Sequence, residues 1–216
     1  MVKVKICGIT NTEDALAAIS FGADALGFLV GKVHFSTGFF ISPEKAAEII
    51  AKLPPFYSSV LVTHLSKPKE VINLAKISNV TTAHLHGSTP EELVEIKTQL
   101  PYLKICKVVN VFDEKAIAEA KAFEGFADGI TLDSGNRETG QIGGTGKTHD
   151  WNISRRIVES VSLPVILAGG LNPDNVIEAI KKVRPYAVDV NFGVSNSDGT
   201  KNHEKMKLFI ERVKLQ

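Results

Sequence analysis

Two side chains in this sequence are suited to moving protons. Cys7 directly follows an alternating apolar run, and Asp133 closes the run Gly129-Ile130-Thr131-Leu132. A thiolate can act as a general base when a cation or a helix N-terminus lies near it. A carboxylic acid at the mouth of a pocket can have a raised pKa and act as a general acid. The alternatives are a buried cysteine that packs as an apolar residue and a carboxylate that caps a helix.

Glycines follow two further apolar runs near the end of the chain. Gly169-Gly170 comes after residues 164–168, and Phe192-Gly193 comes soon after residues 186–190. Glycine lets backbone N–H groups approach an anion closely, and phosphate sites of parallel α/β barrels are often built this way. The alternative is that these glycines only permit tight turns. Their occurrence after successive runs favours a phosphate-binding site and a small phosphorylated ligand.

A third glycine-rich segment, residues 140–148, ends in Gly146-Lys147-Thr148 and partly resembles a nucleotide P-loop. A P-loop also needs glycine at position 141, where this chain has Gln141. We therefore interpret the segment as a lid over the pocket, in which Gly144 and Gly146 allow closure and Lys147 contributes a positive charge.

Charged and imidazole side chains also interrupt or follow apolar runs. Lys5 shares the face of Cys7 by strand alternation, and a buried charge needs a partner, so we expect Lys5 to pair with Asp189 in a neighbouring strand. His86 follows residues 82–85 and is a candidate ligand-binding residue, although a lone histidine is more often structural. No group of His, Cys and Asp residues has the spacing of metal ligands, so no metal is expected.

Positioning these side chains requires elements in strict alternation. Short runs rich in Val, Ile and Leu predict strands at residues 2–6, 24–30, 58–63, 80–85, 103–109, 127–132, 163–168 and 186–190. Segments with helical periodicity lie at residues 12–21, 43–53, 67–77, 90–99, 113–123, 150–160, 173–183 and 201–214. Ser42, Thr89 and Asn172 each precede a proline and are typical helix starts.

Such an alternation predicts an α/β protein with a parallel sheet, and eight strand–helix pairs are the number that closes a (β/α)8 TIM barrel. Nothing resembling a linker divides residues 1–216, so we expect a single TIM-barrel domain. An open doubly wound sheet is the alternative. In a barrel the active site lies at the C-terminal ends of the strands, where Cys7, His86, Asp133 and the glycine pairs would meet.

Composition narrows the class of protein. Hydrophobic residues make up 44% and charged residues 23% of the chain, which excludes an intrinsically disordered protein. The formal net charge of +1 does not favour nucleic acid as a partner, and no apolar run approaches the length of a membrane span. Two cysteines do not indicate a disulfide-stabilised fold. We expect a cytoplasmic protein that acts on a small molecule and is a monomer or a homodimer.

Several motifs in chain order together resemble one enzyme family. They are Lys5-Ile6-Cys7-Gly8-Ile9-Thr10, Leu85-His86-Gly87, Leu132-Asp133, residues 143–151, Gly169-Gly170-Leu171-Asn172-Pro173 and Val188-Asp189-Val190. The chain resembles phosphoribosylanthranilate isomerases, the TIM barrels of tryptophan biosynthesis, over nearly its whole length. The resemblance implies an Amadori rearrangement of N-(5'-phosphoribosyl)anthranilate to 1-(2-carboxyphenylamino)-1-deoxyribulose 5-phosphate, with no cofactor.

The resemblance also implies residue roles. Cys7 matches the general base that removes the C2' proton, and Asp133 matches the general acid that protonates the ribose ring oxygen. Gly169, Gly170 and Gly193 match the phosphate-binding loops, and residues 143–148 match the lid.

Two positions depart from the family pattern. Phe39 occupies the place of an arginine that binds the anthranilate carboxylate, and Ser195 ends a motif that usually reads Ser-Gly-Val-Glu. Lys32, His34 or Arg137 could replace the missing cation. Alternatives are a related isomerase acting on another phosphorylated aminosugar that lacks this carboxylate, and a phosphosugar-binding protein without turnover.

Overall fold

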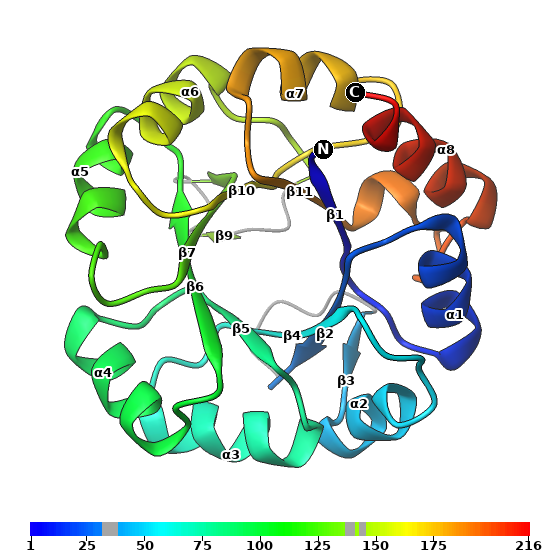
Figure 1. Ribbon diagram of the computed structural model, residues 1–216, viewed down its shortest axis with the longest axis horizontal. Helices are drawn as coiled ribbons and strands as arrows, with labels where there is room; N and C mark the ends of the chain where they lie inside the picture. Colours follow the sequence, from blue (N-terminus) through cyan, green and yellow to red (C-terminus); the bar gives the residue numbers. More distant parts are fainter. Residues whose placement is uncertain (32–38, 137–140, 143–145) are drawn as a thin grey trace.

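Eight parallel strands in the described part of the chain close into a barrel (Figure 1). The computed structural model describes residues 1–31, 39–136, 141–142 and 146–216. The barrel strands are β1 (Lys3–Ile6), β2 (Ala25–Val30), β4 (Ser58–Thr63), β5 (Thr82–Leu85), β6 (Lys104–Asn110), β7 (Gly129–Asp133), β10 (Val165–Leu167) and β11 (Ala187–Val190). They pair in the order β1-β11-β10-β7-β6-β5-β4-β2, and β2 pairs with β1 to complete the ring. The predicted TIM barrel is confirmed.

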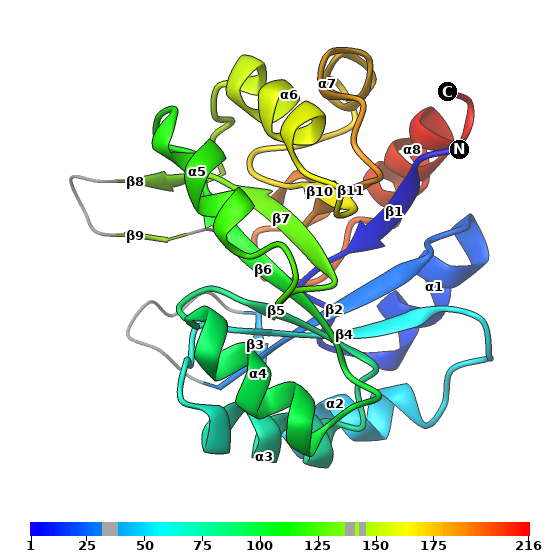
Figure 2. The same ribbon diagram turned by 60° about the vertical axis from the view of Figure 1, so that its left-hand side comes forward.

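Helices cover the outside of this ring (Figures 1 and 2). They are α1 (Thr12–Phe21), α2 (Pro43–Ile50), α3 (Pro68–Ser78), α4 (Pro90–Gln99), α5 (Lys115–Ala122), α6 (Trp151–Ser160), α7 (Val176–Val183) and α8 (His203–Lys214). Two starts follow the predicted capping: Ser42 accepts the Lys45 N–H, and Thr89 forms a reciprocal capping box with Glu92. Within the described ranges, no helix is both long and apolar enough to cross a membrane.

Two helix starts differ from the sequence prediction because side chains form turns there. The Asn172 side chain accepts the N–H groups of Asp174 and Asn175, so α7 begins at Val176 rather than at residue 173. Lys201 forms a β-bridge with Ser195, so α8 begins at His203 rather than at residue 201. The sequence also did not predict β3 (Phe40–Ile41), the β8 (Gly135–Asn136) and β9 (Gln141–Ile142) hairpin, or the short 3-10 helix η1 (Phe192–Val194).

A buried ion pair joins the first and last barrel strands, as the sequence predicted. Lys5 of β1 lies opposite Asp189 of β11, and Nζ is 2.6 Å from Oδ2. Burial alone would lower the pKa of Lys5, but the charges of Asp189 and the Cys7 thiolate more than offset this, and its pKa is raised. Gly27 of β2 leaves the required room, since a β-carbon there would lie 2.9 Å from Lys5 Nζ.

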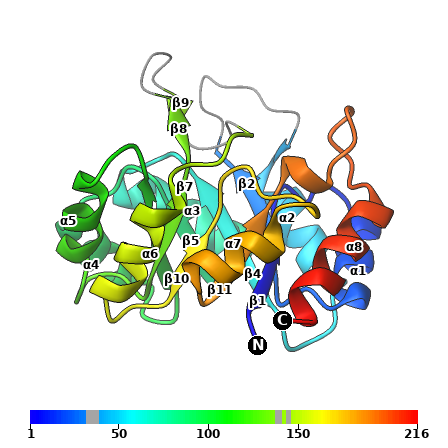
Figure 3. The same cartoon turned by 90° about the horizontal axis from the view of Figure 1, so that it is seen from above.

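The two ends of the barrel carry different features (Figure 3). Both chain termini lie at the end opposite the β8–β9 hairpin. Asp24 holds them there, because its carboxylate binds Lys3 Nζ at 3.0 Å and Lys214 Nζ at 2.5 Å. The strands begin at this end, so it is the N-terminal mouth of the barrel.

A cavity of about 410 Å³ opens at the N-terminal mouth. Lys5, His84 and Cys106 line it, and Tyr57 and Tyr186 lie among its outer residues. Phe56 also lines the cavity, yet its side chain is fully exposed and its backbone has a positive φ of 72°. A positive φ is energetically costly for a bulky residue. The surrounding backbone therefore imposes this conformation on Phe56 and directs its phenyl ring into solvent.

Replacing either member of the Lys5–Asp189 pair alone, as Lys5→Met or Asp189→Leu, is expected to lower the free energy of unfolding by about 3–5 kcal/mol, since the remaining charge stays buried without its partner. Urea unfolding measures the change. The double variant should recover much of the loss, and simple additivity of the single effects would contradict the ion pair.

Candidate functional site

The two residues predicted to move protons lie at the same end of the barrel. Cys7 directly follows β1, and Asp133 is the last residue of β7. Strands β11 and β10 separate β1 from β7 along one side of the ring. A ligand bound over the loops after β10 and β11 would therefore lie between Cys7 and Asp133.

The Cys7 thiol is buried among apolar side chains. Leu29, Phe39, Val60 and Val62 form a cluster with it at the ends of β2 and β4. Burial raises the pKa of Cys7, the positive charges of Lys5 and Lys201 oppose the increase, and Asp189 adds to it. The thiol can serve as a base only to the extent that nearby cations keep it ionised.

Asp133 is held by the backbone that follows it. Its Oδ1 accepts the Ser134 N–H at 2.7 Å, and its carbonyl oxygen accepts the Val111 N–H at 2.9 Å. Asn110 lies beside it in register on β6, with a buried Oδ1 atom that has no hydrogen-bond partner among the described residues. An amide oxygen in this place can accept a proton from a protonated acid or from a ligand hydroxyl.

The glycine loops after β10 and β11 present unused donors. The backbone N–H groups of Gly169, Gly170, Phe192 and Gly193 donate to no acceptor within the described ranges. Gly169 and Gly170 have positive φ values of 78° and 64°, which turn the chain at this point. A group of N–H donors in adjacent loops is the arrangement that binds phosphate.

These loops touch backbone to backbone, which explains why glycine is needed. A β-carbon on Gly193 would overlap the carbonyl oxygen of Leu171 in the preceding loop. A β-carbon on Gly170 would overlap the backbone of Lys147 and Thr148. Three segments, 147–149, 169–172 and 191–194, therefore pack together at one side of the mouth.

The predicted lid is only partly described. Gly146 and Lys147 are exposed beside the phosphate-binding loops, whereas Gly144 lies outside the described residues. Lys32, His34 and Arg137, the candidate replacements for the missing cation, also lie outside them. Their roles stay predictions.

His86 is buried after β5 and stacks on His64, with ring centroids 4.1 Å apart. Burial, then the neighbouring His64, Lys107 and Lys5, keep the pKa of His86 well below its usual value. Its Nδ1 atom is buried without a partner among the described residues, so the neutral ring can bind a ligand atom.

Phe39 lies at the site, where its ring packs edge-on against Phe192 at a centroid distance of 5.0 Å. Phe39 is 3% exposed and Phe192 is 41% exposed. Phe39, which stands in the place of the family's arginine, therefore forms an aromatic pair with Phe192 beside Cys7.

Sequence reasoning missed three residues of this region, namely His64, Asn110 and Lys201. His64 and Asn110 stand at strand ends, where the rule that marked His86 would also have found them. Lys201 gave no such signal, since it resembled the exposed first turn of a helix.

The described residues contain no group of three or more His, Cys, Asp or Glu side chains that could hold a metal ion. The arrangement instead provides a buried thiol, a carboxyl group and a set of phosphate-binding donors. Together these groups can bind a phosphorylated molecule and transfer protons at two of its atoms.

Comparison with known proteins agrees with this chemistry. The family described as N-(5'-phosphoribosyl)anthranilate (PRA) isomerase matches residues 4–212. The isomerase of that name from Methanocella arvoryzae is 45% identical over 216 residues, covering 100% of this chain and 99% of the relative.

Several solved structures cover 100% of both chains. One is a monomeric form generated from the dimeric phosphoribosylanthranilate isomerase of Thermotoga maritima, which matches with a TM-score of 0.84 and 34% identity. A phosphoribosylanthranilate isomerase in complex with reduced 1-(o-carboxyphenylamino)-1-deoxyribulose 5-phosphate matches with a TM-score of 0.84 and 35% identity.

Gly193→Ala is expected to weaken binding of inorganic phosphate by about ten- to a hundredfold, because overpacking of roughly 1–3 kcal/mol forces the two glycine loops apart. Titration calorimetry measures the affinity. Gly125→Ala is the control for a general loss of stability, since its φ of 87° makes alanine strained there although a β-carbon meets nothing within 4 Å. Equal phosphate affinity in both variants would exclude these loops as the anion site.

Proposed function

This chain belongs to the N-(5'-phosphoribosyl)anthranilate isomerase family, and we propose that Cys7 and Asp133 are the general base and general acid of its reaction. The enzyme isomerises N-(5'-phosphoribosyl)anthranilate to 1-(2-carboxyphenylamino)-1-deoxyribulose 5-phosphate. One observation carries the assignment of residues: the thiol and the carboxyl group stand on either side of the backbone donors of the β10 and β11 loops.

The reaction needs one acid and one base at different atoms. Asp133 gives its proton to the ribose ring oxygen as the bond from that oxygen to C1' breaks, and the anthranilate nitrogen forms an iminium ion. The iminium makes the C2' proton acidic, and the Cys7 thiolate removes it to give an enolamine. The enolamine then gains a proton at C1' and loses one from its C2' hydroxyl group, which leaves the ketose product. Each assisted transfer is commonly worth about 10²–10⁴-fold in rate.

The glycine loops fix the substrate between these two groups. The N–H groups of Gly169, Gly170, Phe192 and Gly193 bind the 5'-phosphate, and Lys147 lies beside Gly170. Binding energy at the phosphate thereby holds the ribose over the mouth, with the ring oxygen toward Asp133 and C2' toward Cys7.

Two further side chains contact the sugar or the aromatic amine. His86 offers a neutral Nδ1, and Asp189 has a buried Oδ1 without a partner among the described residues. Asp189 pairs with Lys5, two residues before Cys7, so its free oxygen is suited to accept a hydrogen bond from a ribose hydroxyl group.

A related isomerase acting on an aminosugar without the carboxylate is less favoured, because the relatives that match over the full length carry the same activity name. We place the reaction in the cytoplasm, since a reduced cysteine serves as the base and both cysteines of the chain are free thiols.

Cys7→Ser and Asp133→Asn are each expected to reduce turnover of phosphoribosylanthranilate by about 10²-fold or more, because each removes one proton-transfer group. Loss of substrate fluorescence measures the rate, since the reaction changes the aromatic amine. Phosphate affinity should remain nearly unchanged in both variants. Near-normal turnover in either variant would remove the corresponding role, and no turnover in the unaltered protein would refute the proposed function.

We also propose that the chain forms a homodimer through its N-terminal mouth. Phe56 is a fully exposed phenyl ring at the rim of a cavity of about 410 Å³, and Tyr186 beside it is 56% exposed. Water contact with so much apolar surface is unfavourable in a monomer. A two-fold axis would place the Phe56 ring of each copy in the cavity of the other. The similar Thermotoga maritima protein is described as dimeric.

Phe56→Glu is expected to convert the dimer to a monomer, because the apolar burial of the phenyl ring is lost and a carboxylate must be desolvated to enter the cavity. Analytical ultracentrifugation measures the mass. Val94→Glu, at a half-exposed position on α4, is the control and should stay dimeric. A monomeric unaltered protein at all concentrations would disprove the interface.

A further inference from the structure

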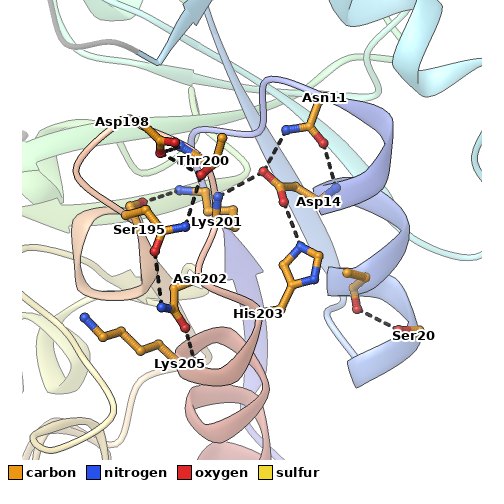
Figure 4. Close-up of polar contacts among 12 residues, drawn as sticks. Asn11, Asp14, Ser20, Ser195, Asp198, Thr200, Lys201, Asn202, His203 and Lys205 are labelled. Carbon is orange, nitrogen blue, oxygen red and sulfur yellow. Dashed lines mark hydrogen bonds and ion pairs between the residues drawn. The ribbon is translucent and has the colours of Figure 1, made fainter.

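Lys201 has a buried ammonium group that the proposed reaction has not used. It is 3% exposed and lies between the loop that carries Ser195 and the start of α1, where Asp14 lies (Figure 4). Its Nζ donates to the Asn191 Oδ1 atom and to the Ser195 hydroxyl group, both at 2.8 Å. These acceptors are neutral, and Nζ forms no ion pair with any described residue.

The ammonium also lies over an aromatic ring. Lys201 Nζ is 4.9 Å from the centroid of Phe39, and Phe39 packs with Cys7. A β-carbon on Gly8, the residue after Cys7, would lie 3.0 Å from the Phe39 ring and would overlap the Asn191 side chain that binds Lys201. The cation and the segment that carries the thiol are therefore packed against the same two side chains, Phe39 and Asn191.

Both departures from the family pattern meet at this lysine. Phe39 stands where the pattern has an arginine, and Ser195 stands where it has a glutamate. Phe39 and Ser195 contact the Lys201 ammonium directly. A glutamate at position 195 would place a carboxylate beside Nζ and neutralise it, whereas serine leaves its positive charge uncompensated.

An ionised Cys7 thiol would offset the positive charge of Lys201. Lys5 and Asp189 neutralise each other at 2.6 Å. Lys201 adds a further buried positive charge, and a buried ammonium group is costly without an anion. Besides Asp14, Cys7 is the group near Lys201 that can supply one.

We propose that Lys201 is the counter-ion of the Cys7 thiolate, a positioning residue that keeps the base ionised without touching the substrate. This inference rests on the proposed role of Cys7 as the base. The thiolate also stabilises the ammonium in return, because the attraction between two charges is mutual.

Each group acts on the pKa of the other: burial is the larger effect on Cys7 and leaves its pKa raised, whereas the charge of Lys201 lowers that pKa. Burial lowers the pKa of Lys201 to about 8, and the Cys7 thiolate is the largest of the charges that oppose the decrease. An ammonium group with that pKa is still mostly protonated at neutral pH.

Other ionisable groups face the same place. They are Lys5 on β1, Asp189 on β11, Asp14 on α1 and, beyond Asp14, His203 on α8. The charge of Asp14 also attracts the ammonium group, but its Oδ2 accepts the main-chain N–H of Lys201 and its Oδ1 binds His203 Nε2 at 2.8 Å, so the carboxylate forms no direct ion pair with Nζ.

The test measures the pKa of the Cys7 thiol directly. A Cys106→Ala background leaves Cys7 as the one thiol, and its alkylation by iodoacetamide is followed against pH. Lys201→Met is expected to raise the thiol pKa and to slow alkylation below that pKa by about tenfold or more, as expected for loss of a nearby opposite charge. Lys201→Arg should restore most of the alkylation rate.

A second pair of variants tests the charge without removing the lysine. Ser195→Glu should neutralise the ammonium and raise the Cys7 pKa, while Ser195→Gln, of similar size and uncharged, should not. If Lys201→Met fails to fold, this pair still decides. An unchanged thiol pKa in Lys201→Met or in Ser195→Glu would overturn the proposal. This holds even if KM or stability changes in the same variant.

The same variants separate this inference from the proposed function. If the thiol pKa responds as expected but no protein of the set converts phosphoribosylanthranilate, the coupling of Lys201 to Cys7 stands and the proposed function fails. If turnover is normal in the unaltered protein and Lys201→Met changes only KM, the proposed function stands and the counter-ion role fails.

Discussion

The Lys5–Asp189 ion pair is the constraint on which the rest of the site depends. It joins the first strand to the last inside the barrel, where an unpaired charge would be costly, and so fixes the seam at which the ring closes. Cys7 lies one inward position above Lys5, and Asn191 lies one inward position above Asp189. The thiol and the loop after β11 are therefore placed relative to each other by the same pair. Gly27 matters for this reason, since a side chain there would occupy the space of both Lys5 and Cys7.

The site combines two kinds of order. Side chains on barrel strands are held by regular pairing, as Asp133 is by Asn110 of β6. The phosphate-binding loops instead depend on backbone packed against backbone, at Gly170 and Gly193, where any β-carbon would force neighbouring segments apart. Rigid strands thus set the direction of proton transfer, while the loops set how far the substrate stands from the thiol and the carboxyl group.

The alternation of apolar runs and amphipathic segments was enough to predict every barrel strand and the closed architecture, because parallel strands buried on both faces have a strong sequence pattern. The start of α1 at Thr12 and the capping box at Thr89 were likewise readable from local residues. The burial of Lys201 could not be predicted in this way, since a lysine at the start of a helix normally faces water. Its burial arises from contacts with Phe39, Asn191 and Ser195, which only the folded chain brings together. The β8–β9 hairpin also escaped prediction, because its strands are two residues each and carry no alternating pattern.

Asp24 binds a lysine from each end of the chain, and both ends lie on the face away from the catalytic loops. The packing of the barrel therefore does not depend on the polypeptide being open between residues 216 and 1. A short peptide could join residue 216 to residue 1, and new termini could be opened in an exposed loop at the same face, such as the one around Gly125, without crossing the catalytic loops. This fold should therefore tolerate circular permutation. In such a variant the order in which the strands are synthesised differs, while their order in the barrel stays the same.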